Sequence, residues 1–277
     1  MVDVGIVILN FKMRALVETC LTTLFNDIKS AGLSVSVIVT DNKSEDGLVE
    51  WIAENFPQVT TIITEGNIGF ARGVNPGLRA LEARYYFVLN PDTQFIEPET
   101  IRRLYDWMEE HPKVGVSAPR LLYGDGTLQY SCHQFPSLSV QLIRRSPLSR
   151  HSFFKKRIDS FLLKDIDRTQ ARPVDWVQGS AMFIRHEALQ EVGLLDEGFW
   201  MYFEDTDWCR RFWQRGWLIY YVPQIALVHH HGRGSASVPG IIAPLFKNPL
   251  ARAHLKSWAR YFWKWRGSRS QNIQPIL

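Results

Sequence analysis

Residues 85–92 read YYFVLNPD, an apolar run of high β propensity that ends in a polar turn. A run without polar alternation predicts a strand that is buried on both faces of a sheet. Similar runs occur at 4–9 (VGIVIL), 35–39 (VSVIV), 59–63 (VTTII) and 114–118 (VGVSA). Helix-length stretches lie between them, at 14–29, 46–55, 76–84 and 98–110. Buried strands that alternate with helices predict an α/β fold, Rossmann-like, whose mainly parallel sheet is flanked by helices.

Polar residues follow these predicted strands, at Asn10, at Asp41 and Asn42, at Asn67 and at 90–92. Because ligands of such sheets bind outside the carboxyl ends of the strands, we expect these side chains to gather at one edge. Taken alone, Asp41 is more readily interpreted as a helix cap. Four polar clusters at the same edge favour a binding site.

The tripeptide Asn-Pro-Asp at 90–92 directly follows the strand predicted at 85–89. A carboxylate at this point can hold a divalent cation, which neutralises the charge that builds on a departing phosphate when a sugar leaves a nucleotide diphosphate. Oxygen ligands favour Mg²⁺ or Mn²⁺. The same tripeptide is a common turn, because proline fixes φ and Asp bonds its neighbours. Asp92 is a candidate metal ligand, and the tripeptide alone supports it weakly.

The sequence EDTD at 204–207 follows the aromatic run FWMYF at 199–203. Acidic residues that open a helix complement its dipole, which explains at least one of them. A carboxylate of this group can also act as the base that removes a proton from an acceptor hydroxyl. The helix dipole does not explain the neighbouring Trp200 and Tyr202, which suit stacking on a sugar ring.

Three consecutive histidines at 229–231 follow the apolar run IALV. Successive residues of a strand point to opposite faces, so His229 and His231 share one side and His230 takes the other. A neutral imidazole can complete a metal site begun by Asp92. A solvent-facing histidine run fits the sequence equally well.

The alternation of strands and helices breaks between 119 and 175, where prolines and basic residues are scattered without a clear period. We interpret this stretch as an insertion or a flexible segment on the side of the active site. Beyond it we expect a strand at 174–184, helices near 186–192 and 204–214, and a pair of strands near 218–229.

The chain from 252 to 269 is rich in Lys and Arg and has no acidic residue. On a helical wheel Leu255, Trp258, Ala259 and Phe262 form one stripe beside a basic face. A basic amphipathic helix with Trp and Phe can lie at an anionic membrane surface. Packing against the preceding domain is nearly as good an interpretation. No nucleic-acid-binding motif accompanies the charge, so we expect no nucleic acid partner.

The composition is that of an ordinary globular protein, with 277 residues, 45% of them hydrophobic, and a net charge of +4. Three widely spaced cysteines argue against a disulfide framework or a structural zinc site and favour a reducing compartment. The N-terminus has no basic or cleavage region of a signal peptide. No stretch approaches the ~20 apolar residues of a membrane span. We expect a cytoplasmic protein, soluble or peripheral at the inner face of the cell membrane.

The motifs together resemble family 2 inverting glycosyltransferases with the GT-A fold, most of all the rhamnosyltransferase-like branch that builds bacterial surface polysaccharides. The resemblance covers about residues 3–237 and keeps the order of the motifs. They are NFK, DNKSEDG (41–47), EGNIGFARGVNPG (65–77), LNPD (89–92), WVQGSAMFIR (176–185), GLLDEGFWMYFEDTDWCRR (193–211), GW, YVP and HHHGRGS (229–235).

For the donor site, the resemblance implies that Asp41 recognises a pyrimidine base and that Asn67 lines the nucleotide site. It makes Asp92 the metal ligand of a DxD-type motif whose first Asp is Asn90 here. One histidine of 229–231 would also coordinate the metal. The histidine segment is one residue longer than the usual H-x-x-G-x-S, so the choice of histidine stays open.

For catalysis, the resemblance places the general base at Asp205, with Glu204 beside it. Two departures concern the loop before the metal motif, where Val74 and Pro76 stand in place of a frequent Asn and a non-proline. Neither departure removes a carboxylate named above.

The expected enzyme is a hexosyltransferase with a GT-A domain at 1–240 and a basic aromatic C-terminal helix at 241–277. It would move a sugar, by preference L-rhamnose from dTDP-rhamnose, to a saccharide or lipid-linked acceptor with Mg²⁺ or Mn²⁺. A UDP-hexose-dependent glucosyl- or galactosyltransferase and a non-catalytic nucleotide-sugar-binding protein are the alternatives. The candidate site comprises catalytic Asp205 and Glu204, donor-binding Asn10, Asp41, Asn67 and Asn90, acceptor-binding Trp200 and Tyr202, and metal-binding Asp92, His229 and His231.

Overall fold

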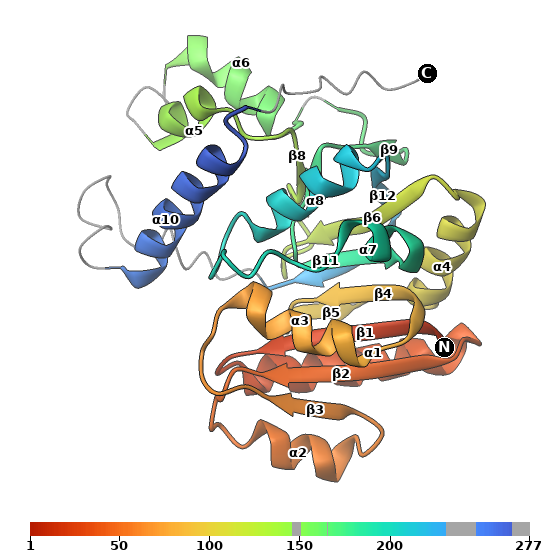
Figure 1. Cartoon of the computed structure of the whole chain (residues 1–277). Helices are drawn as coiled ribbons and strands as arrows, with labels where there is room; N and C mark the ends of the chain where they lie inside the picture. Colours follow the sequence, from red (N-terminus) through yellow and green to blue (C-terminus); the bar gives the residue numbers. More distant parts are fainter. Residues whose placement is uncertain (146–150, 165, 231–247, 268–277) are drawn as a thin grey trace.

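One ten-stranded sheet forms the centre of the molecule, and helices cover both of its faces (Figure 1). This computed structural model describes residues 1–145, 151–164, 166–230 and 248–267. The principal strands are β1 (Val2–Asn10), β2 (Val35–Asp41), β3 (Thr60–Ile63), β4 (Ala83–Leu89), β5 (Thr93–Phe95), β6 (Val114–Leu122), β11 (Ala181–Arg185) and β12 (Leu218–His229). They lie in the order β3, β2, β1, β4, β11, β6, β12 and β5. The predicted α/β class is confirmed.

The N-terminal half of the sheet is parallel, as its continuous apolar runs predict. β1 pairs in parallel with β2 and β4, and β2 pairs in parallel with β3. In this register Asn10 lies beside Asp41 at the carboxyl ends of β1 and β2. Asn90 directly follows the carboxyl end of β4, so the polar residues after these strands share one edge of the sheet.

Strand β11 makes the sheet mixed, because it runs antiparallel between β4 and β6. Ala181, at its start, is opposite Leu89 at the end of β4. The backbone N–H of Asn90 donates to Ser180 O at 2.9 Å. The antiparallel direction therefore brings the segment before β11 to the same edge as the parallel strand ends.

The remaining strands extend the sheet or stand apart from it. β12 runs parallel to β6 and antiparallel to β5. β7 (Leu128–Gln129) pairs with β6, β9 (Arg172–Pro173) pairs with β12, and β8 (Cys132–His133) pairs with β10 (Trp176–Val177) in a separate two-stranded sheet.

Two cores lie on opposite faces of the sheet, and alternate residues of β1 point into each. Val4, Ile6 and Ile8 are fully buried in the first core, and Val7 and Leu9 belong to the second. Helices α1 (Arg14–Ala31), α2 (Leu48–Asn55) and α4 (Thr100–Glu110) cover the first core. Helices α3 (Phe70–Ala80), α7 (His186–Val192) and α8 (Glu204–Gln214) cover the second. Full burial of each large apolar side chain contributes roughly 1.5–3 kcal/mol.

The helix predicted at 76–84 is wrong in its bounds, since α3 begins at Phe70 and contains Pro76 in its interior. Proline removes one helical hydrogen bond, so local preference disfavours this helix. Close packing on β1 overrides it: a Cβ on Gly73 would come within 2.5 Å of Leu9, and one on Gly77 within 2.7 Å of Val7. The two glycines let the helix approach the sheet.

Two other expectations are corrected by the structure. The stretch near 218–229 is a single strand, β12, whose pairing with β6 shifts register between Val222 and Ala226. The stretch at 119–175 is not without regular structure, because it completes β6 and carries α5 (Leu138–Arg145) and α6 (Ser152–Phe161). These two helices form a separate layer near the C-terminal helix (Figure 1).

The C-terminal helix α10 (Pro249–Lys264) packs against α8 and the loop before it. Asn248 caps it by accepting from Leu250 N–H at 2.9 Å, and proline at the first helical position completes a typical helix start. Tyr261 and Trp265 form a buried aromatic cluster with Phe199 and Phe203. Leu255 of the expected apolar stripe is 40% exposed. Among the helices of the described ranges, none combines the length and apolarity needed to cross a membrane.

Candidate active site

A pocket of about 700 Å³ opens at the carboxyl edge of the sheet. The end of β4, the start of α8 and the first half of α10 contribute to its walls, together with the loops after β2 and β3. Eight of the predicted site residues line it, namely Asn67, Asn90, Asp92, Trp200, Tyr202, Glu204, Asp205 and His229. Residues far apart in the sequence thus meet in one cavity.

Asn10 and Asp41 lie beneath this pocket and do not line it. Both are buried, and Asn10 Nδ2 donates to Asp41 Oδ1 at 2.7 Å. Ser44 donates its backbone N–H to Asp41 Oδ2 at 2.8 Å and its hydroxyl to Oδ1. The carboxylate of Asp41 therefore holds the loop that follows β2.

The neighbouring Asn42, which the sequence interpretation placed at this edge but did not choose as a site residue, does line the pocket. Its Nδ2 donates to Gly69 O at 3.2 Å and joins the loop after β2 to the loop before α3. Gly69 has φ of +92°, and a Cβ there would lie 2.1 Å from Trp200 O. Phe70 N–H donates to that same oxygen at 2.7 Å. Glycine is thus required for the contact that places Trp200 on the pocket wall.

Asp92 and His229 converge on one point of the pocket, with Asp92 Oδ1 3.2 Å from His229 Nε2. His229 Nδ1 lies 2.8 Å from Gln129 Oε1, an acceptor, which assigns the ring proton to Nδ1. Asn90 Nδ2, a donor, lies 3.3 Å from Nε2. Nε2 and the carboxylate oxygen of Asp92 therefore lie next to each other at the pocket.

An imidazole nitrogen beside a carboxylate oxygen can share one cation, and a histidine whose Nδ1 is anchored by a hydrogen bond is typical of metal sites. The donor set of Asp92 and His229 fits a divalent ion whose remaining positions are filled by phosphate oxygens and water. Within the described ranges, no group of three or more His, Cys, Asp or Glu residues could by itself hold a metal ion. His231, the other predicted ligand, lies outside those ranges.

The first turn of α8 presents two carboxyl groups to the pocket. Tyr202 and Phe203, just before the helix, have φ of +69° and +67°. Such left-handed backbone is costly for bulky residues and persists only where the surroundings hold it. This sharp entry points Glu204 and Asp205 at the cavity.

Asp205 is held in place by two backbone donors. Its Oδ2 accepts from Gly179 N–H at 3.1 Å and its Oδ1 from Thr206 N–H at 2.7 Å. Burial raises the pKa of Asp205 above its usual value, and these hydrogen bonds oppose the increase. Asp205 is an oriented carboxylate with raised basicity.

Glu204 differs from its neighbour in its contacts. Burial, followed by the charges of Asp205 and Asp207, raises the pKa of Glu204 well above its usual value. Its buried Oε2 has no hydrogen-bond partner among the described residues. Glu204 therefore stays protonated more readily, whereas the contacts of Asp205 stabilise its ionised form.

Aromatic and polar residues complete the wall beside α8. Trp200 is 37% exposed, and the ring of Tyr202 lies 4.9 Å from that of His254 in α10. His254 and Leu250 line the pocket, as do residues 178–180 before β11. The sequence interpretation did not predict Leu250 or His254, and it included residues 178–180 only as part of the WVQGSAMFIR motif. These residues were missed because only the fold brings α10 and the segment before β11 to this edge.

The sequence model of "Glycosyl transferase family 2" matches residues 5–193 of the chain. The N-acetylglucosaminyl-diphospho-decaprenol L-rhamnosyltransferase of Mycobacterium tuberculosis is 30% identical over 253 residues, 84% of this chain and 80% of that protein. The dTDP-rhamnosyl transferase RfbF of Shigella flexneri is 24% identical over 219 residues, 78% of this chain and 66% of that protein.

Among solved structures, the chain resembles the mannosyltransferase PcManGT of Pyrobaculum calidifontis, which was determined in complex with GDP-Man and Mn²⁺. The TM-score is 0.58 at 16% sequence identity, and the match covers 97% of this chain and 76% of that one. This likeness agrees with the GT-A fold predicted from the sequence.

Proposed function

The chain belongs to glycosyltransferase family 2, and on this premise we propose that it transfers L-rhamnose from dTDP-rhamnose, with inversion, in cell-surface polysaccharide synthesis. The proposed acceptor is a saccharide or a lipid-linked saccharide. Two relatives support this choice by their names, one as an L-rhamnosyltransferase that acts on a diphospho-decaprenol and one as a dTDP-rhamnosyl transferase. Use of a divalent metal is supported by PcManGT, which holds Mn²⁺.

The observation that carries this proposal is the presence of two different carboxylate environments in one pocket. Asp92 faces His229 at the end of β4, and Asp205 is anchored on the first turn of α8. A transferase needs both: a place for the diphosphate and a base for the acceptor. A binding protein has no need of the second.

On the donor side, Asp92 and His229 would hold Mg²⁺ or Mn²⁺, which when bound neutralises the charge on the leaving diphosphate. Asn67 and Asn42 are placed to bond the nucleotide, and Asn90 keeps the imidazole of His229 in position. Asp41 acts from below, by fixing the loop that carries Asn42.

On the acceptor side, Trp200 and Tyr202 form an aromatic wall for a sugar ring. Asp205 accepts the proton of the acceptor hydroxyl. As the proton leaves, the oxygen of that hydroxyl attacks the anomeric carbon from the side opposite the diphosphate. The C–O bond to the diphosphate breaks as the new bond forms, so a single displacement inverts the anomeric centre. Glu204 is proposed to orient the acceptor hydroxyl as a protonated donor.

A lipid-linked acceptor would place the enzyme at the inner face of the cell membrane. Helix α10 supports this location, because its outward face carries basic residues together with Leu255 and Trp263, which are 40% and 68% exposed. Basic and aromatic residues on one helical face are typical of interfacial binding.

The test is a panel of dTDP-rhamnose, UDP-glucose and UDP-galactose with Mn²⁺, measuring release of nucleotide diphosphate and transfer to a diphospho-polyprenol-linked N-acetylglucosamine. We expect transfer from dTDP-rhamnose alone. Transfer from a UDP-hexose instead would replace the donor in the proposal. Tight donor binding without any turnover would support a non-catalytic protein.

A further inference from the structure

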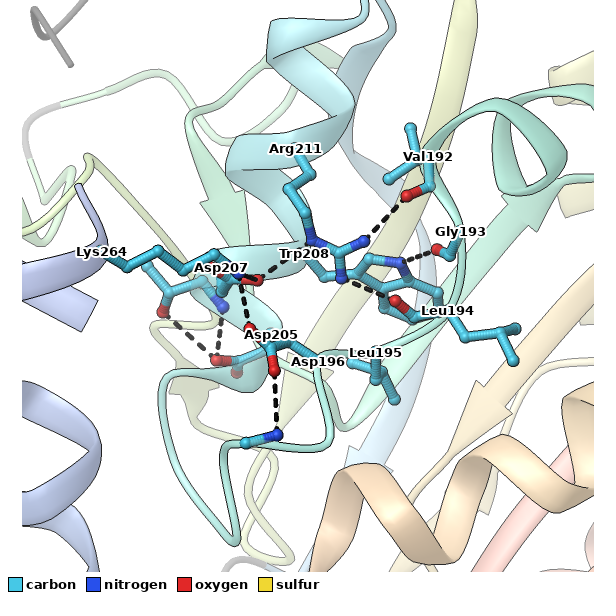
Figure 2. Close-up of polar contacts among 12 residues, drawn as sticks. Val192, Gly193, Leu194, Leu195, Asp196, Asp205, Asp207, Trp208, Arg211 and Lys264 are labelled. Carbon is cyan, nitrogen blue, oxygen red and sulfur yellow. Dashed lines mark hydrogen bonds and ion pairs between the residues drawn. The ribbon is translucent and has the colours of Figure 1, made fainter. Parts of the chain in front are cut away.

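Asp207, two residues after the proposed base, is a fully buried carboxylate that binds groups from two helices. Arg211 Nε of α8 lies 3.0 Å from its Oδ2, and Lys264 Nζ at the end of α10 lies 2.8 Å from its Oδ1. Trp265 Nε1 also donates to Oδ1, at 2.9 Å. Figure 2 shows Asp207 between Lys264 and Arg211. This single side chain therefore joins α10 to the first turn of α8.

The other side of that turn is fixed to the body of the protein. Arg211 donates to Val192 O at 2.9 Å and to Leu194 O at 2.7 Å, and Trp208 Nε1 donates to Gly193 O at 2.8 Å (Figure 2). The segment after α7 thus holds α8 from one direction while α10 holds it from the other.

Helix α10 also holds the strained entry to α8 directly. Ser257 Oγ donates to Met201 O at 2.8 Å. The ring of His254 lies 5.3 Å from that of Phe203, and the ring of Tyr261, two turns further along α10, lies at the same distance from Phe203. Left-handed backbone at 202 and 203 requires such support.

We propose that Asp207 is a positioning residue, through which Lys264 and Trp265 make the C-terminal helix part of the active site. Its buried carboxylate fixes the turn that carries Asp205, so that the base stays aligned with the acceptor hydroxyl. The inference rests on the proposed function, since it takes Asp205 as the base.

The chain offers a matched control for this contact. Arg260 of α10 binds Asp196 at 3.1 Å, and Lys264 binds both Asp196 and Asp207. Arg260→Met therefore removes an ion pair between α10 and the segment that joins α7 to α8, and leaves the contacts of Asp207 intact. Lys264→Met and Asp207→Asn remove the contact itself.

Two readouts test the proposal in the full-length protein. With dTDP-rhamnose, Lys264→Met and Asp207→Asn should lower kcat by about tenfold to a hundredfold, as a displaced catalytic group does, while the dissociation constant of the donor stays within twofold. Hydrogen exchange of the Thr206 and Asp207 amides should be faster by about tenfold in both variants. Lys264→Arg should restore both values, and Arg260→Met should change neither.

Folded Lys264→Met and Asp207→Asn proteins that match Arg260→Met in both readouts would overturn the proposal. A Lys264→Met/Asp207→Asn double variant whose loss of kcat equals the product of the two single losses would also count against it, because two changes that break a shared contact are not independent. If Asp207→Asn does not fold, Trp265→Phe, which keeps an aromatic side chain and loses the Nε1 hydrogen bond, decides by the same readouts. If the wild-type chain transfers no sugar, the proposed function fails, and hydrogen exchange still decides whether the contact fixes α8.

Discussion

At the scale of single residues, two adjacent carboxyl groups have different surroundings. Asp205 accepts from backbone N–H groups, whereas Glu204 Oε2 finds no partner in the described chain. Backbone donors stabilise a carboxylate, and burial without donors favours the neutral acid. Asp205 is therefore suited to accept a proton, and Glu204 is suited to donate a hydrogen bond.

Asp205→Asn should lower turnover by about 10²–10⁴-fold, because Asn keeps the shape of the side chain but cannot accept a proton. The affinity for the donor should survive. Single-turnover kinetics and a donor titration measure the two quantities separately.

Glu204→Gln is the matched comparison, and we expect a smaller loss because Gln still donates a hydrogen bond. A nearly active Asp205→Asn protein beside an inactive Glu204→Gln protein would assign the base to Glu204. Full activity of both variants would place proton removal elsewhere.

Burial of Asp205 also makes a prediction about pH. Its folded pKa is raised, so the carboxylate gains a proton, and loses its function as a base, at a pH above the usual range near 4. Activity should therefore rise with pH through an acid limb that lies above that range. The two carboxyl groups are close enough to titrate as a pair, so the limb reports on both.

A profile of kcat against pH at saturating donor checks this expectation, with refolding controls at each acid pH. An acid limb at or below pH 4 would contradict the raised pKa of Asp205.

Eight of the eleven residues predicted for the site line one pocket. Those that follow parallel strands meet there because such strands end at the same edge of a sheet. Sequence reasoning could not separate Asp41 from Asn42. Asp41 ends β2, Asn42 follows it, and both are buried; only the structure shows that Asp41 binds Ser44 whereas Asn42 lines the pocket. A position in a sequence predicts the edge of a sheet, not the direction of a side chain.

At the scale of elements, α10 presents two different faces. Its inner face reaches the pocket through Leu250 and His254. Its outer face exposes Leu255, Trp263 and several basic side chains. The same helix can therefore contact a lipid surface and a substrate, without any change in its packing.

Leu255→Ser with Trp263→Ser should reduce partition onto anionic vesicles, because each apolar side chain lost from the interface weakens binding. Nucleotide binding should be unchanged. Sedimentation with vesicles of phosphatidylglycerol and phosphatidylcholine, at two salt concentrations, measures the effect.

Ile63→Ser provides the control, since Ile63 is 59% exposed at the end of β3, away from α10 (Figure 1). Equal partition of the wild-type protein and the Leu255/Trp263 double variant would show that this face is an ordinary surface.

Helices with clear apolar periods were predicted well, and those fixed by tertiary contacts were not. A helix was predicted at 76–84, yet α3 begins six residues earlier, at Phe70, because Gly73 and Gly77 allow close packing on β1. Local preference gives way where packing contributes more free energy.

At the scale of the whole molecule, the donor should stabilise the fold through the site at the sheet edge. At a ligand concentration of 100 times Kd, binding adds about 2.7 kcal/mol to the free energy of unfolding. For a protein of this size that corresponds to an increase in Tm of roughly 5–10 °C. The increase should require dTDP and Mn²⁺ together.

Asp92→Asn should abolish the Mn²⁺-dependent part of this increase, and His230→Ala, next to His229, should retain it. Thermal unfolding with dTDP, with Mn²⁺ and with both is the measurement. A full Mn²⁺-dependent shift in Asp92→Asn would exclude Asp92 as a ligand.

The antiparallel strand β11 also governs how this protein can emerge from a ribosome. Its neighbours β4 and β6 both precede it in the chain, so both are synthesised before the strand that pairs with them exists. Until Arg185 has left the exit tunnel, two long apolar edges stay open to other nascent chains. We expect this interval of translation to be the period when the protein most needs a chaperone.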